Sequence, residues 1–378
     1  MPVPARLAAF YFAYFAYVGA FVPYFPLYLA GRGYDARQIA LVLALPAIAR
    51  TFAPTIWGWL ADRSGAWRGI AVFSCAALVA SFALMPFAAG LAELAMLVAA
   101  MSVLSAGALP LVEAITLSAL SGRSGSYGPV RLWGSIGFIA GVLAIGAWLD
   151  ARPVDSLPTT LLALSFAALL VSLLLPRRSP ARIATAAEEP GAELARPAIR
   201  ALLAAGFCMA VAHGALYAFF TLHLERLGYA GATIGALWTL GVLAEIVVFL
   251  YLPAIFRRFA LSTILLASFL CAALRFAAIG WTSELLVMLV LAQLLHALTF
   301  GAYHAASVAS IHRLFPAAAH GRGQALFSSL SYGAGGAAGM LLAGWAWEAG
   351  GAALAFSSAG GVALLGAALV LRLRRAGL

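Results

Sequence analysis

Long apolar runs alternate with short polar stretches along the whole chain. Mostly apolar windows of about 20 residues, the length a helix needs to cross a bilayer, recur throughout. Because lipid offers no water to satisfy backbone groups, each window is predicted to be a helix. We expect twelve spans, at 7–29, 38–61, 69–89, 92–118, 128–149, 157–176, 200–223, 232–254, 260–281, 284–311, 321–346 and 351–371.

The longest polar stretch divides these spans into six and six. We therefore expect an all-α integral membrane protein with twelve transmembrane helices arranged as two six-helix bundles related by pseudo-two-fold symmetry. The predicted boundaries are an N-terminal bundle at 1–176, a cytoplasmic linker at 177–199 and a C-terminal bundle at 200–378.

A weak internal repeat agrees with this division. Shifting the second half by 195 positions aligns Gly33-Tyr34 with Gly228-Tyr229. Such a trace is typical of a duplicated six-helix unit, in which the substrate site lies near the middle of the membrane between the halves.

Composition supports a membrane protein. Hydrophobic residues make up 64% of the chain and charged residues 10%, with a mean hydropathy of +1.00. The net charge is +10, and all 23 basic side chains behind it are arginines, since the chain has no lysine. If the N-terminus is cytoplasmic, sixteen of the 23 arginines fall on the cytoplasmic side and four on the outer side. This asymmetry predicts a multi-pass protein of the bacterial inner membrane with both termini in the cytoplasm.

The same asymmetry explains the basic charge without a nucleic-acid partner. We expect the lipid bilayer and a small-molecule substrate as partners, and a monomer. The three cysteines, Cys75, Cys208 and Cys271, lie far apart inside predicted spans, which indicates packing and not a disulfide framework or a metal site. No cofactor and no catalytic residue is expected.

Five charged residues lie inside the apolar runs: Arg50, Glu113, Arg131, Glu245 and Arg275. An ionisable side chain at bilayer depth costs roughly 2.5 to 3.5 kcal/mol on insertion scales, so it is kept where it faces a partner or a water-filled cavity. Together they indicate a polar pathway through the membrane.

A loop pattern with spaced glycines and an Asp-Arg pair follows the second span. Gly58, Asp62, Arg63 and Gly65 match the signature G-x-x-x-D-R-x-G-R-R, and the two positions after Gly65 depart from it. This segment resembles the loop motif of the major facilitator superfamily, which controls conformational change in that family. The resemblance implies a transporter.

Two further segments narrow the resemblance. The start of span five, 127–135, and the 240–245 segment in span eight are similar to the proton-coupled branch that contains phenylpropionate permeases and, more distantly, lactose permease. In that branch an acid in span four and an arginine in span five contribute to the substrate site. The resemblance places these roles on Glu113 and Arg131.

The same branch uses an acid in span eight, an arginine in span nine and a histidine in span ten for proton coupling. These roles carry over to Glu245, Arg275 and either His296 or His304. Lactose permease has a further acid three residues beyond its histidine. In this chain a hydroxyl residue occupies that offset, Thr299 from His296 or Ser307 from His304, so the lactose-permease proton site is not reproduced intact.

The chemistry of Glu245 suits a proton carrier. Burial penalises the carboxylate, whereas a nearby guanidinium favours it, so movement of Arg50 or Arg275 relative to Glu245 would load and release a proton. A permanent Glu245–Arg275 ion pair is the alternative. For each histidine, a helix-packing hydrogen bond is the alternative to a transport role.

Arg131 offers a planar guanidinium that matches a carboxylate. An organic anion would replace Glu113 on it, and the alternative is a static salt bridge. Trp133 is expected as an apolar wall, with a lipid-facing position as the alternative.

Aromatic stripes in spans one and seven include Tyr17, Phe21 and Tyr217. If they face the cavity, they favour an aromatic substrate body, whereas interhelical packing is the alternative.

The sequence therefore predicts proton-coupled uptake of a small organic acid, with the proton as coupling ion. Within transport, a sugar/proton symporter and a drug/proton antiporter remain open. An intramembrane enzyme acting on a lipid-linked substrate needs a catalytic cluster near one interface, whereas the ionisable residues are spread over six spans. A receptor without transport is the remaining class.

Overall fold

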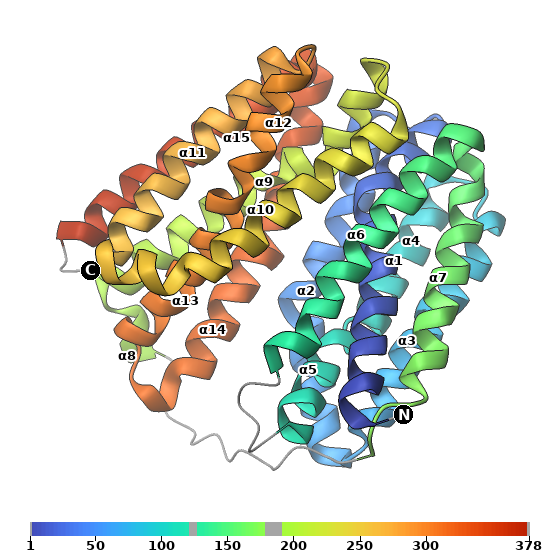
Figure 1. The fold of residues 1–378 in the computed structure, drawn as a ribbon, viewed down its shortest axis with the longest axis horizontal. Coiled ribbons are helices and arrows are strands. Elements are labelled where there is room, and N and C mark those ends of the chain that lie inside the picture. Colours follow the sequence, from blue (N-terminus) through green and yellow to red (C-terminus); the bar gives the residue numbers. More distant parts are fainter. Residues whose placement is uncertain (1, 121–126, 178–190, 376–378) are drawn as a thin grey trace. The chain divides into compact units, whose positions relative to one another are not determined.

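The computed structural model describes residues 2–120, 127–177 and 191–375, and these residues form helices joined by short connections (Figure 1). The apolar stretches explain this, because helices satisfy their own backbone groups in lipid. The helices before the central polar stretch are α1 (Val3–Gly31), α2 (Ala36–Ser64), α3 (Trp67–Leu84), α4 (Leu91–Ser105), α5 (Ala108–Ala119), α6 (Tyr127–Ala151) and α7 (Leu157–Ser172).

The second half begins with a short helix and continues with long ones. These are α8 (Gly191–Leu194), α9 (Pro197–Arg226), α10 (Gly231–Arg258), α11 (Leu261–Thr282), α12 (Leu286–Leu294), α13 (Tyr303–Leu314), α14 (His320–Ser328) and α15 (Gly336–Arg375). A π-helical segment, Ala297–Ala302, joins α12 to α13, and a second, Ser329–Gly335, joins α14 to α15. Each π segment therefore lies inside a membrane span.

The last two spans are separated by a pair of glycines. Gly350 and Gly351 leave the helical conformation inside α15, and Gly351 has a positive φ of 64°. An L-residue with a side chain rarely adopts this conformation, so glycine permits the turn. With α4 and α5 forming one span, the described residues then contain twelve spans. The prediction of an all-α membrane protein with twelve transmembrane helices is confirmed.

The chain divides by its internal contacts into two compact units. Within the described residues, unit 1 takes in 2–34, 52–120, 127–177 and 230–236. Unit 2 takes in 35–51, 191–229 and 237–375. Each unit thus includes the first turns of a helix, α2 or α10, that continues in the other unit.

Most of the predicted linker, together with Arg123, Arg178 and Arg182, lies outside the described residues. In the part that is described, α9 already begins at Pro197, three residues before the expected start of the seventh span. Proline at the first position of a helix needs no hydrogen-bond partner for its nitrogen, which suits this start.

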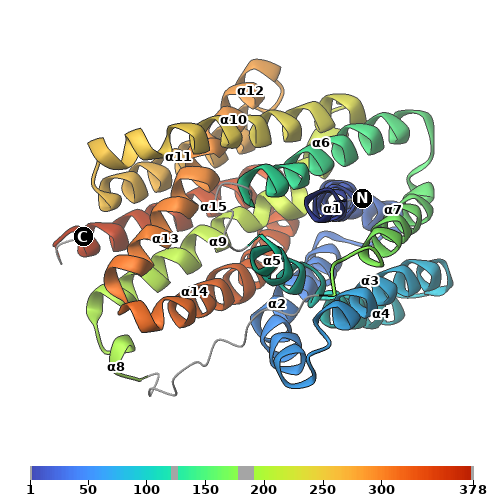
Figure 2. The same cartoon turned by 60° about the horizontal axis from the view of Figure 1, so that its bottom comes forward.

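In unit 1, α1 and α6 run side by side (Figures 1 and 2). The contact is made by small residues on α6. A Cβ on Gly137 would overlap the carbonyl of Phe12, and one on Gly141 would overlap the carbonyl of Ala16. The missing side chains let the two backbones approach closely, which provides packing where lipid supplies no hydrophobic drive between helices.

In unit 2, glycines also allow close contact between the backbones of α9 and the first part of α15. Gly214 lies against Gly339, and a Cβ on Gly339 would overlap the carbonyl of Val211. The α1–α6 pair (spans one and five) thus corresponds to the pair of α9 and the first part of α15 (spans seven and eleven). In each pair, glycines allow the two backbones to come into contact.

The turns after spans one and seven repeat in detail. Gly33 has a φ of 80° and Gly228 a φ of 83°. Tyr34 N–H donates to the carbonyl of Leu29, and Tyr229 N–H donates to the carbonyl of Leu224, 195 residues further on. Both turns are left-handed glycine C-caps. The aligned Gly-Tyr pairs therefore have one conformation.

Candidate functional site

An ion pair joins two successive spans of unit 1. Arg131, in the first turns of α6, places its Nε 3.6 Å from Oε1 of Glu113 in α5. The side chains are 32% and 37% exposed, so neither is sealed in the core. The structure therefore brings together the two residues predicted for substrate binding, and it leaves them reachable.

Aromatic rings of α1 lie beneath the guanidinium of Arg131. Its central carbon lies 4.4 Å from the ring centre of Phe15 and 5.3 Å from that of Tyr11. The hydroxyl of Tyr11 donates to Oγ1 of Thr116, 3.2 Å away, which fixes the ring. A cation over aromatic faces is stabilised by their quadrupoles. These contacts orient Arg131 independently of Glu113.

The other aromatic residues predicted for the substrate site have different surroundings. Trp133 is 46% exposed and its ring packs edge-on against Phe12. Residues two apart on a helix point in different directions, so Trp133 does not share the face of Arg131. Tyr17 is buried and, with Phe21, packs against Phe82 of α3. Tyr17 and Phe21 thus pack between helices, and Trp133 lies on an exposed face of α6.

Unit 2 holds a buried arginine with neutral partners. Arg275 of α11 is 1% exposed. Its Nε donates to the carbonyl of Ala292 at 2.9 Å, its Nη2 to Oε1 of Gln293 at 2.9 Å, and its Nη1 to Oγ1 of Thr299 at 3.3 Å. The end of α12 supplies the carbonyl, because helix ends leave carbonyls without an intrahelical partner. Thr299 occupies one of the two positions where the sequence has a hydroxyl in place of the lactose-permease acid.

Glu245 of α10 meets span ten through His296. Oε2 of Glu245 lies 4.0 Å from Nε2 of His296, and the two side chains are 18% and 10% exposed. Gly301 makes room for this approach, since a Cβ there would lie 3.0 Å from Cγ of Glu245. Nδ1 of His296 is buried and has no partner among the described residues. At 4.0 Å the carboxylate and the imidazole interact electrostatically, and one bridging water or a small approach would bring them within reach of proton transfer.

The two candidate histidines lie in one column of rings but in different environments. His296 stacks on Phe300 at 5.3 Å between ring centres, and Phe300 stacks on His304 at 6.5 Å. His304 shares a 2.9 Å hydrogen bond with the hydroxyl of Tyr332. The Tyr332 hydroxyl thus occupies Nδ1 of His304, whereas a ring nitrogen of His296 lies 4.0 Å from the carboxylate of Glu245. The geometry favours His296 as the partner of Glu245.

Tyr217 and Arg50 complete the charged region of unit 2. Tyr217 stacks against Trp238 with ring centres 6.3 Å apart. The side chain of Arg50 is exposed. Arg50 and Glu245 both lie close enough to Tyr217 and Tyr332 to interact with them electrostatically. Tyr217 thus lies with the residues predicted for proton coupling and in a different unit from Arg131.

The loop motif, Gly58 to Gly65, covers the last turns of α2 and the turn that follows it. Gly65 has a φ of 69°, and the side chains of Asp62 and Arg63 are exposed. The guanidinium of Arg63 lies 5.4 Å from the ring centre of Trp59, and Gly58 lies one turn before Asp62 on the same helix. The glycine therefore ends α2 with a left-handed turn.

Several contacting residues were not predicted as site residues. Tyr11 and Phe15 are four apart in span one, a spacing that puts both on one helix face, but nothing in the sequence shows that this face meets Arg131. Gln293 and Tyr332 are ordinary polar residues of apolar spans. The buried Arg275 was the signal that an acceptor such as Gln293 had to exist, whereas nothing in the sequence indicated the contact of Tyr332 with His304.

Comparison with known proteins assigns the chain to a protein family. A model of the MFS_1 like family matches residues 5–358, which is most of the chain. The chain belongs to this family. It is therefore a transporter of the major facilitator superfamily, as the loop motif indicated, and the expectation that it is a transporter and not an enzyme is confirmed.

Two curated relatives are similar over long stretches. The probable 3-phenylpropionic acid transporter of Escherichia coli (strain K12) is 30% identical over 312 residues, which cover 80% of each chain. The maltose permease of Geobacillus stearothermophilus is 33% identical over 198 residues, which cover 52% of this chain and 48% of the permease.

Solved structures agree on the fold. The nucleoside transporter NupG superposes with a TM-score of 0.83 at 18% identity, covering 99% of both chains. The POT family transporter PepTSo superposes with a TM-score of 0.74 at 14% identity, covering 99% of this chain and 97% of that one. At such identities the likeness shows the shared fold alone.

Proposed function

We propose that this MFS transporter takes up an aromatic carboxylate together with a proton across the bacterial inner membrane, with both termini in the cytoplasm. The observation that carries the proposal is the setting of Arg131, which faces Glu113 on one side and the rings of Phe15 and Tyr11 on another. A guanidinium beside aromatic faces suits a ligand with both a carboxylate and a ring.

Binding then proceeds by exchange of partners. The substrate carboxylate replaces that of Glu113 on the planar guanidinium of Arg131, which donates two parallel hydrogen bonds to the carboxylate oxygens of the ligand. The partial exposure of the pair supports this exchange, because a sealed ion pair resists opening. The printed name of the phenylpropionic acid relative supports the substrate class.

Proton coupling rests on Glu245 and His296 in unit 2. Protonation of Glu245 beside His296 removes a buried charge before the transporter changes its access, which favours loading of the proton first. Release on the cytoplasmic side follows when the carboxylate regains a positive neighbour. Arg275, held by Gln293, Thr299 and Ala292, supplies a fixed positive field close to the pair.

The test is uptake into proteoliposomes that contain the purified full chain. Labelled 3-phenylpropionate should accumulate when the outside is made acidic, and an uncoupler should abolish the accumulation. Unlabelled benzoate and cinnamate should compete. Absence of proton-dependent accumulation of any aromatic acid would contradict the proposal.

A sugar/proton symporter is the second candidate, favoured by the match to maltose permease. In that case Glu113 and Arg131 would hydrogen-bond hydroxyl groups, and maltose would compete where the aromatic acids do not. A drug/proton antiporter would instead expel a preloaded substrate when the outside is acidified. One assay with both loading directions therefore separates the three.

A further inference from the structure

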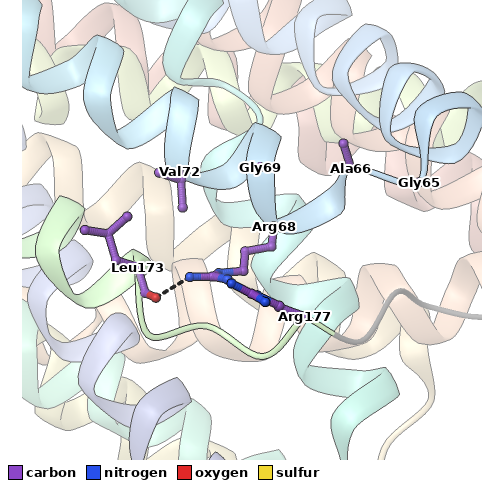
Figure 3. A pocket seen from close by; sticks show the side chains of 7 residues that line it. All are labelled: Gly65, Ala66, Arg68, Gly69, Val72, Leu173 and Arg177. Atoms are coloured by element: carbon purple, nitrogen blue, oxygen red, sulfur yellow. Dashed lines mark hydrogen bonds between the residues drawn. The ribbon is translucent and has the colours of Figure 1, made fainter.

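A basic cavity lies at one membrane end of unit 1, where α3 begins and α7 ends (Figure 3). It has a volume of about 370 Å³. The described residues that line it are Gly65, Ala66, Arg68, Gly69, Val72, Leu173 and Arg177. The transport site of unit 1 uses none of them.

Two guanidinium groups line this cavity, and none of its described lining residues is acidic. Arg68 is anchored, since its Nη2 donates to the carbonyl of Leu173 at the end of α7 (Figure 3). Its Nε is buried and has no partner among the described residues. Arg177 is exposed and adds a second positive charge. The anchored and the exposed guanidinium leave the cavity with a charge that no lining side chain neutralises.

The start of α3 adds to this positive field. Its N-cap, Ala66, makes no side-chain cap, and its first turn has no acidic residue. The first backbone N–H groups of a helix lack intrahelical acceptors and carry the positive end of the helix dipole. Backbone donors and two guanidinium groups together favour a phosphate-type anion.

An exposed apolar face of α7 ends at the cavity, because its last residue, Leu173, lines the cavity. Phe166, Leu170 and Leu173 recur along one face of α7 and its end, and each is 46% to 50% exposed. Phe73 of α3 is 47% exposed. In a membrane-spanning chain such a face meets acyl chains. A ligand that fits both features has an anionic head and an apolar tail.

We propose that this cavity binds the phosphate of an anionic phospholipid, with Arg68 and Arg177 as its ligands and the exposed face of α7 against its acyl chain. On the topology expected from the arginines, the lipid belongs to the cytoplasmic leaflet, where anionic headgroups attract basic residues. The proposal does not depend on the transported substrate.

The test is native mass spectrometry of the full chain titrated with phosphatidylglycerol or phosphatidylcholine in detergent. Wild-type protein should bind the first phosphatidylglycerol more tightly than phosphatidylcholine. The double variant Arg68→Gln/Arg177→Gln should lose about fivefold in phosphatidylglycerol affinity for each arginine, as a basic residue near an anionic headgroup contributes at this level. Binding of phosphatidylcholine should not change.

Arg257→Gln is the matched control, because Arg257 is an exposed arginine at the end of α10 that does not line the cavity. It should leave the lipid preference intact, and Arg68→Lys/Arg177→Lys should retain most of it while keeping the charge. If the double glutamine variant does not fold, the lysine variant and the single substitutions carry the test.

Three results would overturn the proposal. Equal affinity of the wild-type protein for the two lipids would remove the anion preference. An equal loss in Arg257→Gln would show that net charge alone acts. Displacement of phosphatidylglycerol by millimolar inorganic phosphate would identify a small-anion site in place of a lipid site.

Discussion

Arg131 and Arg275 are both arginines within membrane spans and both lie over aromatic rings, yet they differ in exposure and in hydrogen-bonding partners. Arg131 is about one-third exposed, faces a carboxylate and lies over aromatic rings. Arg275 is 1% exposed and donates to a carbonyl, an amide and a hydroxyl, all neutral. The first arrangement can exchange its partner for a ligand. The second keeps a charge buried, and the three hydrogen bonds of the guanidinium offset the free energy of removing it from water.

The difference separates the tasks of the two units. An exposed ion pair contributes little to stability, whereas removal of a buried hydrogen-bonded charge leaves its acceptors without partners. We therefore expect substitutions at Arg131 to affect binding and substitutions at Arg275 to affect folding first.

Arg275→Ala should have the largest effect. It leaves Oε1 of Gln293 and the carbonyl of Ala292 buried without a donor, which should lower the free energy of unfolding by about 3 kcal/mol. Thermal unfolding of the purified protein measures the loss. Arg226→Ala, an exposed arginine of the same unit that lies over Trp347, is the control. Equal stability of the two variants would contradict a supporting role for Arg275.

Arg131→Ala should abolish substrate binding and leave folding intact. Loss of a charge-assisted contact to the substrate carboxylate should weaken binding of 3-phenylpropionate by at least about 30-fold, or about 2 kcal/mol. Isothermal titration measures the affinity, and thermal unfolding should change little. Arg152→Ala is the control, because Arg152 follows the same helix and lies over the ring of Trp148. Undiminished uptake by Arg131→Ala would remove this residue from the site.

Glu245→Gln should uncouple transport from the proton gradient. The amide keeps the shape of the side chain but takes up no proton, so exchange of substrate should continue while uphill accumulation is lost. With a gradient of one pH unit the loss is about tenfold in accumulation, or about 1.4 kcal/mol per proton. Counterflow and gradient-driven uptake in the same proteoliposomes separate the two activities.

The control for Glu245 is Glu284→Gln, which removes an exposed carboxylate in the connection before α12. His296→Gln should resemble Glu245→Gln, whereas His304→Gln should accumulate substrate normally, because His296 lies 4.0 Å from the carboxylate and His304 pairs with the hydroxyl of Tyr332. Retained uphill uptake by Glu245→Gln would exclude the coupling role.

The smallest expected effect concerns the starts of α2 and α10. Asp35 caps α2, since Gln38 N–H donates to its Oδ1 at 2.8 Å. The position 195 residues later is Ala230, and there Asp150 of α6 accepts instead from the N–H groups of Gly231 and Ala232, at 2.5 and 2.9 Å. One helix start is thus capped locally and the other by a distant residue.

Asp150→Ala should therefore loosen the first turn of α10 by about 1 kcal/mol, the usual contribution of a helix cap. Hydrogen exchange of the amides of residues 231–234 should quicken about fivefold. Adding Ala230→Asp should restore protection by giving α10 the cap that α2 has. Failure of this second substitution to protect the amides would show that Asp150 acts by its interhelical contact and not as a cap.

The sequence by itself determined the twelve spans, because apolar runs of membrane length have one stable backbone conformation in lipid. It determined the Gly33 and Gly228 turns, which need a residue free to take a positive φ. It also identified the charged residues that need partners inside the membrane. All of these follow from local chemistry.

Only the tertiary structure decided what those charges meet. That Arg131 lies over Phe15, that Arg275 bonds Gln293, and that His296 lies 4.0 Å from Glu245 depend on how each helix is rotated and at what depth it packs. Periodicity assigns residues to the face of one helix, but it carries no information about which helix lies opposite. Glycine contacts such as Gly137 against Phe12 set that rotation and depth, and with them the site.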